Sequence, residues 1–191
     1  MPRPARLPLV VLLVSAGALG GCAEQQDGGP VAGAAQVAAR QPARVDRVID
    51  GDTLKVRLPD GRRKTVRVLG IDTPETKKPD TPVECGGPQA SAAMARLALR
   101  GGGPGAKGRD VVLVRDPSGD REDRFGRVLA YVDADGVDLG ERQVADGWAT
   151  VYAFQGRRFQ RRARYERAQD RAQAERRGSW SACEGDFHSS R

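Results

Sequence analysis

Four carboxylates and one arginine at the two ends of residues 50–75 are of types that could do chemistry together: Asp50, Asp52, Arg67, Asp72 and Glu75. Carboxylates placed close together repel one another unless a cation lies among them, and oxygen-only ligands suit a hard cation such as calcium rather than zinc. A guanidinium group can bind phosphate oxygens through two parallel hydrogen bonds. This set of side chains therefore indicates metal-assisted hydrolysis of a phosphodiester.

A predicted β-hairpin brings these side chains to one end of a sheet. Residues 53–58 alternate apolar and polar side chains, as a half-buried strand does, and residues 64–69 can return antiparallel to them. Residues 59–61 have the sequence Pro-Asp-Gly, and Asp-Gly tolerates the positive φ of a tight turn. Because a hairpin brings its outer ends together, the two carboxylates before it should meet the two after it.

The remaining elements are predicted from periodicity and from helix start and stop signals. We expect further strands at residues 41–49, 111–114 and 128–132, and helices at residues 88–98, 138–146 and 157–177. The second helix begins at Asp138, which forms a capping-box-like pattern with Glu141. On this pattern alone, the fold class is α+β with an antiparallel barrel or sheet.

Three segments of the sequence resemble the thermonuclease (staphylococcal nuclease) family. They are D-G-D-T at residues 50–53, R-V-L-G-I-D-T-P-E-T at residues 67–76 and D-R-F-G-R at residues 123–127, in the family's order. The resemblance covers roughly residues 42–184. It implies an α+β fold built on a five-stranded OB-fold β-barrel with about three helices.

The residues and the resemblance together suggest a calcium site. Asp52 and Asp72 are the expected metal carboxylates, the backbone carbonyl of Thr73 is the expected neutral ligand, and Asp50 is expected to lie behind them in a turn. The partner would be DNA, RNA or both, and the resemblance implies 3′-phosphorylated products.

Three further side chains are expected to act on the substrate. Glu75 is placed to bind the attacking water and serve as general base, a role that the resemblance also suggests. Arg67 and Arg127 would clamp the phosphate. Taken singly, each arginine would more often be a solvated or salt-bridged surface group.

Aromatic side chains could stack on a base. Phe125 stands where the family commonly shows Tyr, so it can stack but cannot donate a hydroxyl hydrogen bond. Tyr152 is expected to bind nucleotide, although Tyr152 and Phe154 could equally belong to the core. Gln143 falls where a core residue of the second helix is expected.

The N-terminus predicts an exported lipoprotein of the cell envelope. Two arginines precede an apolar run at residues 7–19, which is typical of a signal peptide, and the run ends in Leu-Gly-Gly-Cys at Cys22. We expect residues 1–21 to be removed, Cys22 to carry a lipid that anchors the protein to a membrane, and residues 22–41 to be a flexible tether. The alternative is an ordinary signal peptide that leaves Cys22 as a spare thiol.

The other two cysteines, Cys85 and Cys183, most simply form a disulfide in an exported chain, although two unpaired thiols are the alternative. His188 is the only histidine and lies in an expected C-terminal tail, residues 185–191, which disfavours a zinc site.

Charge does not decide the function. The chain of 191 residues has a net charge of +7, which fits a polyanionic partner and equally fits a solvated surface. A calcium-dependent phosphodiesterase, expected to be a monomer, is the leading hypothesis. A non-catalytic OB-type module that binds nucleic acid or protein and a structural envelope lipoprotein are the alternatives.

Overall fold

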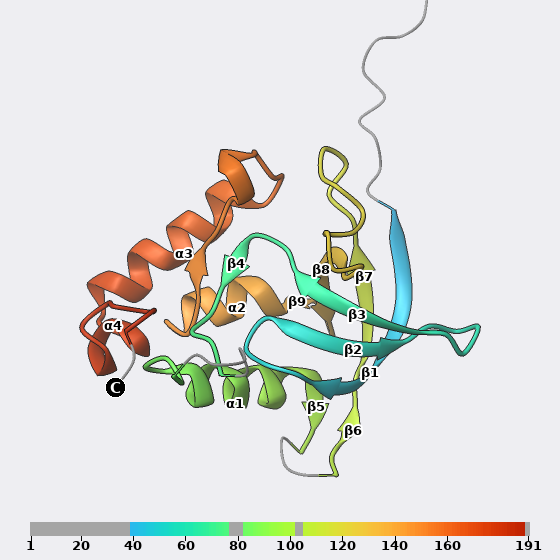
Figure 1. Cartoon of the computed structure of the whole chain (residues 1–191), viewed down its shortest axis with the longest axis horizontal. Coiled ribbons are helices and arrows are strands. Elements are labelled where there is room, and N and C mark those ends of the chain that lie inside the picture. The colour runs from blue at the N-terminus through green and yellow to red at the C-terminus, as the bar shows by residue number, and fades with distance from the viewer. Residues whose placement is uncertain (1–38, 77–81, 102–104, 190–191) are drawn as a thin grey trace, which may run out of the picture. The chain divides into compact units, whose positions relative to one another are not determined.

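The structure, a computed structural model, describes residues 39–76, 82–101 and 105–189 (Figure 1). The expected signal peptide, Cys22 and nearly all of the expected tether lie outside the described residues. Among the residues that are described, no helix is long and apolar enough to cross a membrane.

Five strands close into a barrel. They are β1 (Arg40–Val48), β2 (Thr53–Arg57), β3 (Arg63–Val68), β7 (Asp110–Val114) and β8 (Val128–Ala134). The sheet order is β3-β2-β1-β7-β8, continued by the short β9 (Val137–Asp138), and a parallel pairing of β3 with β8 closes the barrel. The expected fold class, an α+β fold on a five-stranded OB-type barrel, is confirmed.

Two short antiparallel ribbons and four α-helices complete the described part of the chain. The ribbons pair β4 (Ile71–Asp72) with β10 (Thr150–Val151) and β5 (Leu99–Arg100) with β6 (Lys107–Gly108). The helices are α1 (Gly87–Ala98), α2 (Leu139–Ala145), α3 (Arg162–Ala174) and the single turn α4 (Ser179–Ala182), and a 3₁₀ turn covers Phe154–Gly156. In Figure 1, α1 and α2 lie beside the barrel, and α3 lies alongside β10.

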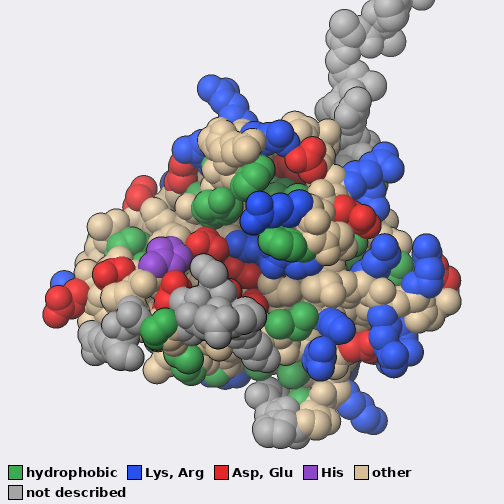
Figure 2. Space-filling view, in the orientation of Figure 1, with side chains coloured by type: hydrophobic (Ala, Val, Ile, Leu, Met, Phe, Trp, Pro, Cys, Tyr) green, Lys and Arg blue, Asp and Glu red, His purple; other side chains and the backbone are tan. Residues whose placement is uncertain are grey.

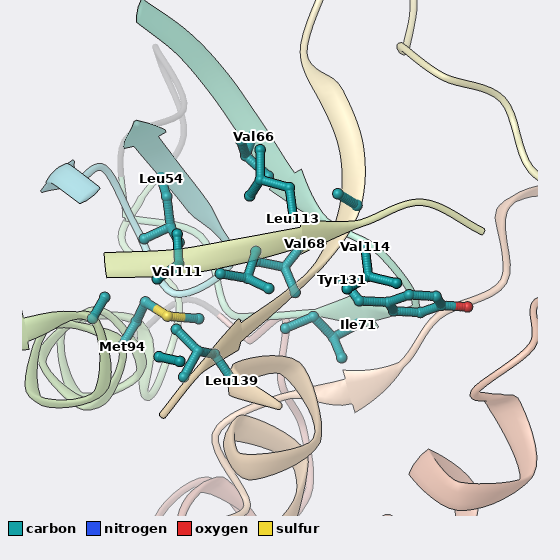
Figure 3. Packing of buried hydrophobic residues seen from close by; sticks show 14 of the residues in the cluster. Leu54, Val66, Val68, Ile71, Met94, Val111, Leu113, Val114, Tyr131 and Leu139 are labelled. Atoms are coloured by element: carbon teal, nitrogen blue, oxygen red, sulfur yellow. The ribbon is translucent and has the colours of Figure 1, made fainter. Parts of the chain in front are cut away.

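The core fills the barrel and extends to the helices that cover it. Inward-facing residues of the strands, such as Leu54, Val66 and Leu113, pack with Met94 of α1 and Leu139 of α2 (Figure 3). All five side chains are at most 2% exposed. This continuous apolar packing fixes the ends of β2 and β3 relative to both helices.

Helix α3 is shorter than the predicted helix over residues 157–177. Its first residue is Arg162, because Phe159 is buried in the core and the backbone N–H of Gln160 donates to Asp116, 2.6 Å away. The helix ends where Arg176 takes a left-handed conformation with φ of 51°. Tertiary contacts therefore override the helix propensity of residues 157–161.

Both boundaries of the predicted domain also change. Strand β1 begins at Arg40, so the last two residues of the expected tether belong to the sheet. The described part of the expected C-terminal tail is packed, because Phe187 is buried and its ring lies 4.9 Å from that of Trp180. Within residues 185–189 of the expected tail, Phe187 therefore packs against the helix α4 that precedes it.

Candidate active site

The β2–β3 hairpin places Asp52 beside Arg67. Thr53, which follows Asp52, pairs with Arg67 across the two strands, and the Val68 N–H donates to the Asp52 carbonyl at 2.8 Å. Strand β4 then follows β3 almost at once and carries Asp72. The hairpin thus brings the carboxylates from its two ends together, as the sequence predicts.

Arg67 bridges the two carboxylates that were expected to bind metal. Its Nη1 lies 2.8 Å from Asp52 Oδ2, and its Nη2 lies 2.8 Å from Asp72 Oδ1. Nη1 also donates to the Ile71 carbonyl at 2.9 Å, and the Arg67 side chain is only 14% exposed. The single positive charge of the guanidinium therefore offsets one of the two carboxylate charges, and the backbone carbonyl of Ile71 helps to hold it in place.

Asp52 is buried among oxygen atoms. Its Oδ1 accepts a hydrogen bond from the Thr53 hydroxyl at 2.8 Å, and its Oδ2 accepts one from the Thr73 hydroxyl at 3.3 Å. The Asp52 N–H donates to Asp50 Oδ1 at 3.2 Å, so Asp50 closes the turn behind Asp52. Burial, followed by the neighbouring Asp52 carboxylate, raises the pKa of Asp50 to about 6.

Glu75 lies on the loop after β4 and is held by Glu84. The Glu75 N–H donates to Glu84 Oε2 at 2.7 Å, and the Glu84 N–H donates back to the Glu75 carbonyl at 3.0 Å. The Glu75 side chain accepts a hydrogen bond from the Thr76 N–H at 2.8 Å. Sequence analysis missed Glu84, since a single acid in a proline-rich loop gives no signal of such a pairing.

Arg127 directly precedes β8, the strand that pairs with the one carrying Arg67. Val128, the next residue, pairs in parallel with Val66, so Arg127 emerges from the same pair of strands that carries Arg67. Asp123 holds Arg127 by accepting from its Nε at 2.7 Å and from its backbone N–H at 2.9 Å. The D-R-F-G-R segment is therefore a turn that orients its last arginine.

The three candidate aromatic side chains are all on the surface. Phe125, Tyr152 and Phe154 are 68%, 44% and 57% exposed, which removes the alternative that Tyr152 and Phe154 belong to the core. The guanidinium of Arg127 lies 5.4 Å from the centre of the Phe125 ring. Tyr152 is tied to the site by its N–H, which donates to the Gly70 carbonyl just before β4.

Gln143 of α2 is fully buried and holds the Asp50–Asp52 turn in place. Its Nε2 donates to the carbonyls of Gly51, at 2.8 Å, and Ala90, at 3.0 Å. A Cβ on Gly51 would lie 2.7 Å from the Thr73 hydroxyl, so this turn packs tightly between β4 and α1. The signal for this role was present in the sequence, as a polar residue at a core position of the second helix.

The donor set suits a hard cation. Within the described ranges, no group of three or more His, Cys, Asp and Glu side chains has the arrangement of a metal site. Asp52 and Asp72 instead form a pair of carboxylates joined by Arg67, with the hydroxyls of Thr53 and Thr73 on Asp52, and burial raises the pKa of Asp72 despite the nearby Arg67. Two carboxylates with more negative charge than one guanidinium offsets offer the oxygen ligands that a hard cation such as calcium prefers.

Known nucleases are similar to this chain over much of its length. The thermonuclease of Staphylococcus hyicus is 36% identical over 144 residues, which cover 75% of this chain and 78% of that protein. Endonuclease YncB of Bacillus subtilis (strain 168) is 41% identical over 107 residues, 56% of this chain and 46% of that protein. The SPbeta prophage-derived endonuclease YokF of the same organism is 41% identical over 107 residues, 56% of this chain and 33% of that protein. The chain therefore spans less than half the length of these two endonucleases.

The model of one protein family matches the part of the chain that contains most of β3, all of β7 and β8, and the four described α-helices. The match runs over residues 65–182 and is to the family described as staphylococcal nuclease homologue. It includes four of the side chains that lie at the site, Arg67, Asp72, Glu75 and Arg127. Together with the closed five-stranded barrel, this match shows that the chain belongs to the staphylococcal nuclease homologue family.

Proposed function

We propose that the protein is a calcium-dependent phosphodiesterase that hydrolyses DNA, RNA or both to 3′-phosphorylated products. The observation that carries the proposal is the Arg67 bridge, which joins a carboxylate from each end of the hairpin within 2.8 Å of one guanidinium. The relatives named as a thermonuclease and as endonucleases support the same reaction. Lys and Arg side chains gather over the side of the molecule that carries the β2–β3 hairpin, which suits a polyanion (Figure 2).

The two arginines would bind the phosphate. The contacts described for Arg67 use Nη1 and Nη2, and its Nε–H donates to no residue in the described ranges. A guanidinium has five N–H donors, so Arg67 can offer Nε–H to a phosphate oxygen while it still contacts Asp72. Arg127, aligned by Asp123, would supply further donors to the oxygens that gain charge in the transition state.

Glu75 would act as general base. The paired hydrogen bonds with Glu84 fix the backbone on both sides of the Glu75 amide and carbonyl, so the side chain starts from a defined point beside Asp50 and Asp72. A carboxylate held in this way can orient a water molecule and accept its proton as the phosphodiester is attacked. The proton of the water moves to Glu75 as the water oxygen bonds to phosphorus, the bond from phosphorus to the 5′ oxygen on the opposite side breaks, and the 5′ oxygen takes up a proton from solvent.

Calcium would be held by Asp52, Asp72 and the backbone carbonyl of Thr73, with Asp50 supporting the turn. When bound, calcium supplies positive charge against the phosphodiester, which has to gain negative charge during attack. The chain itself contributes the alignment of these oxygens, through the hairpin and through the Gln143 contact to Gly51.

Cleavage of single-stranded DNA and RNA tests this proposal. The purified wild-type protein should cut at least one of the two substrates with calcium and should lose this activity with a chelator. The Glu75→Gln variant should have a kcat about 100-fold or more below that of the wild-type protein. The exposed Glu184→Gln offers a matched control that should retain activity, and labelling of product ends should reveal a 3′-phosphate. Binding without cutting would instead favour the non-catalytic module. Cutting that survives both the chelator and Glu75→Gln would contradict the roles of calcium and of Glu75.

We also propose that the protein is exported and anchored to the cell envelope by a lipid on Cys22. The apolar run that ends in Leu-Gly-Gly-Cys supports this location. Incorporation of a labelled fatty acid by the wild-type protein, and its loss in Cys22→Ser, would test it. Incorporation that is unchanged in the variant would rule out this anchor.

A further inference from the structure

The C-terminal segment, residues 183–189, is fastened to the loop that follows the site. A disulfide joins Cys183 to Cys85, and the Cys85 N–H donates to the Ser189 carbonyl at 2.8 Å. Phe187 is buried and packs edge-to-face on Trp180. A covalent bond, a backbone hydrogen bond and an aromatic contact thus hold this segment at three points.

The loop to which it is fastened is the one that holds Glu75. Cys85 directly follows Glu84, whose carboxylate and N–H both pair with the Glu75 backbone, at 2.7 and 3.0 Å. Residues 82–86 contain no helix or strand longer than a single bridge. The position of Glu84 therefore depends on what packs against the loop, and the C-terminal segment is what packs there.

His188 extends from this segment between two carboxylates. Its Nδ1 lies 3.0 Å from Glu84 Oε2, and its Nε2 lies 3.6 Å from Asp72 Oδ2. Figure 2 shows the single histidine, in purple, on the surface beside acidic side chains. Each nitrogen of an imidazole ring can contact a different partner, so one ring can set the separation of two carboxylates on different loops.

We propose that His188, carried by the C-terminal segment, is a positioning residue for Asp72 and Glu84. The inference rests on the proposed function. His188 orients the Asp72 carboxylate, which also forms an ion pair with Arg67. It orients the Glu84 carboxylate as well, which accepts a hydrogen bond from the Glu75 backbone N–H. The disulfide keeps the histidine within reach, because it fixes the start of the segment five residues earlier.

Single substitutions at His188 separate this role from simple packing. Because the ring is 56% exposed, His188→Ala should leave the thermal midpoint nearly unchanged but lower kcat about tenfold, with KM changed less than twofold. His188→Asn can retain the contact that Nδ1 makes with Glu84, and His188→Gln can retain the contact that Nε2 makes with Asp72. Partial recovery of kcat in either variant would show which contact matters. Glu184→Gln, on the same segment and exposed, is the control.

Hydrogen exchange at two backbone amides gives a readout that needs neither metal nor substrate. In the oxidised protein, the N–H groups of Glu75 and Cys85 should exchange slowly, since they donate to Glu84 and Ser189. Dithiothreitol reduces the disulfide to two thiols and is itself oxidised to its cyclic disulfide. The exchange rate at both amides should then rise about tenfold or more, and kcat should fall. The double variant Cys85→Ser/Cys183→Ser should behave like the reduced protein, and dithiothreitol should not change its exchange rate or its kcat.

The outcomes distinguish the inference from the function on which it rests. Suppose that the oxidised wild-type protein cuts nucleic acid, and that both His188→Ala and the reduced protein cut it equally well. The inference is then wrong and the proposed function stands. If exchange rises at Cys85 alone and Glu75 stays protected, the segment only adds stability, and the positioning role is again wrong. If the oxidised wild-type protein cuts nothing, the proposed function fails, and with it the catalytic meaning of His188.

Discussion

Gln143 donates a hydrogen bond of 2.8 Å to the carbonyl of Gly51, although 92 residues of sequence separate the two. The bond runs from the interior of α2 to the turn that carries Asp50 and Asp52. It makes the geometry of the acidic turn depend on a helix that contributes no side chain to the chemistry.

Gln143→Ala should therefore destabilise the protein. The variant removes the donor to two buried carbonyls and leaves a cavity, and we expect the free energy of unfolding to fall by about 2–4 kcal/mol. Urea denaturation measures this change. Gln173→Ala, an exposed glutamine on α3, should change the free energy of unfolding by less than about 0.5 kcal/mol. Equal stability of the two variants would mean that the Gly51 contact adds nothing.

Arg127→Lys should lower kcat on single-stranded DNA by about 100- to 1000-fold, as expected for loss of an aligned donor to the transition state. Lysine retains the charge but cannot reproduce the two-pronged contact, and it cannot contact Asp123 in the same way. Arg124→Lys, three residues earlier and stacked 4.7 Å above the Phe125 ring, is the matched control and should lose less than about threefold. A similar loss in both variants would indicate a general effect of the loop.

Phe125→Ala should weaken binding of a single-stranded oligonucleotide. Stacking of one base on an aromatic ring contributes about 1–3 kcal/mol, so we expect Kd to rise by roughly 5- to 150-fold. Fluorescence anisotropy in a Glu75→Gln background measures binding without cutting. Val137→Ala removes an exposed apolar side chain from β9 and should leave Kd unchanged. An unchanged Kd in the Phe125→Ala variant would show that this ring does not stack on a base of the bound oligonucleotide.

Asp116 should make stability depend on acid pH. Burial alone would raise its pKa, but hydrogen bonds from the Gln160 N–H, Ser118 and the Tyr131 hydroxyl outweigh burial and hold the pKa below its ordinary value. A lowered folded-state pKa means that the ionised group stabilises the fold above the unfolded-state pKa of about 3.9. This stabilisation is lost as the pH falls through the folded-state pKa.

Asp116→Asn should consequently be less stable than the wild-type protein at pH 7, and the difference should shrink toward pH 3. Chemical denaturation at both pH values gives the comparison, with the exposed Asp170→Asn as control. A difference that stays constant with pH would show that the side chain's shape, and not its charge, is what matters.

Local sequence patterns were sufficient to predict the hairpin and its acidic ends. The signals for the hairpin all lie within one short stretch: the alternation of apolar and polar side chains, the Pro-Asp-Gly turn, and the spacing of Asp52, Arg67 and Asp72. Neighbouring residues therefore determine that the hairpin forms. The first helix was predicted for the same reason, because Pro88 begins it and its apolar stripe is regular.

The contacts of Glu84 and His188 could not be predicted in this way, and for Gln143 the pattern marked a polar residue at a core position but not its partner, Gly51. Each contact joins segments that come together only after the chain has folded, and such a contact leaves no periodic signal. Residues 157–161 show the converse effect, since their composition favours a helix but Phe159 is drawn into the core and Asp116 binds the backbone beside it. Tertiary packing decided the structure at all of these positions.

The parallel pairing of β3 with β8 has a consequence for when the protein can act. Val66 and Val128 pair although α1 and β7 lie between them in the chain, so this pairing joins two segments that are synthesised at different times. Contacts of such long sequence separation form late in folding. Arg67 and Arg127 are brought close only once β3 and β8 have paired. A partly folded chain, including one still emerging from the ribosome, therefore lacks the assembled site.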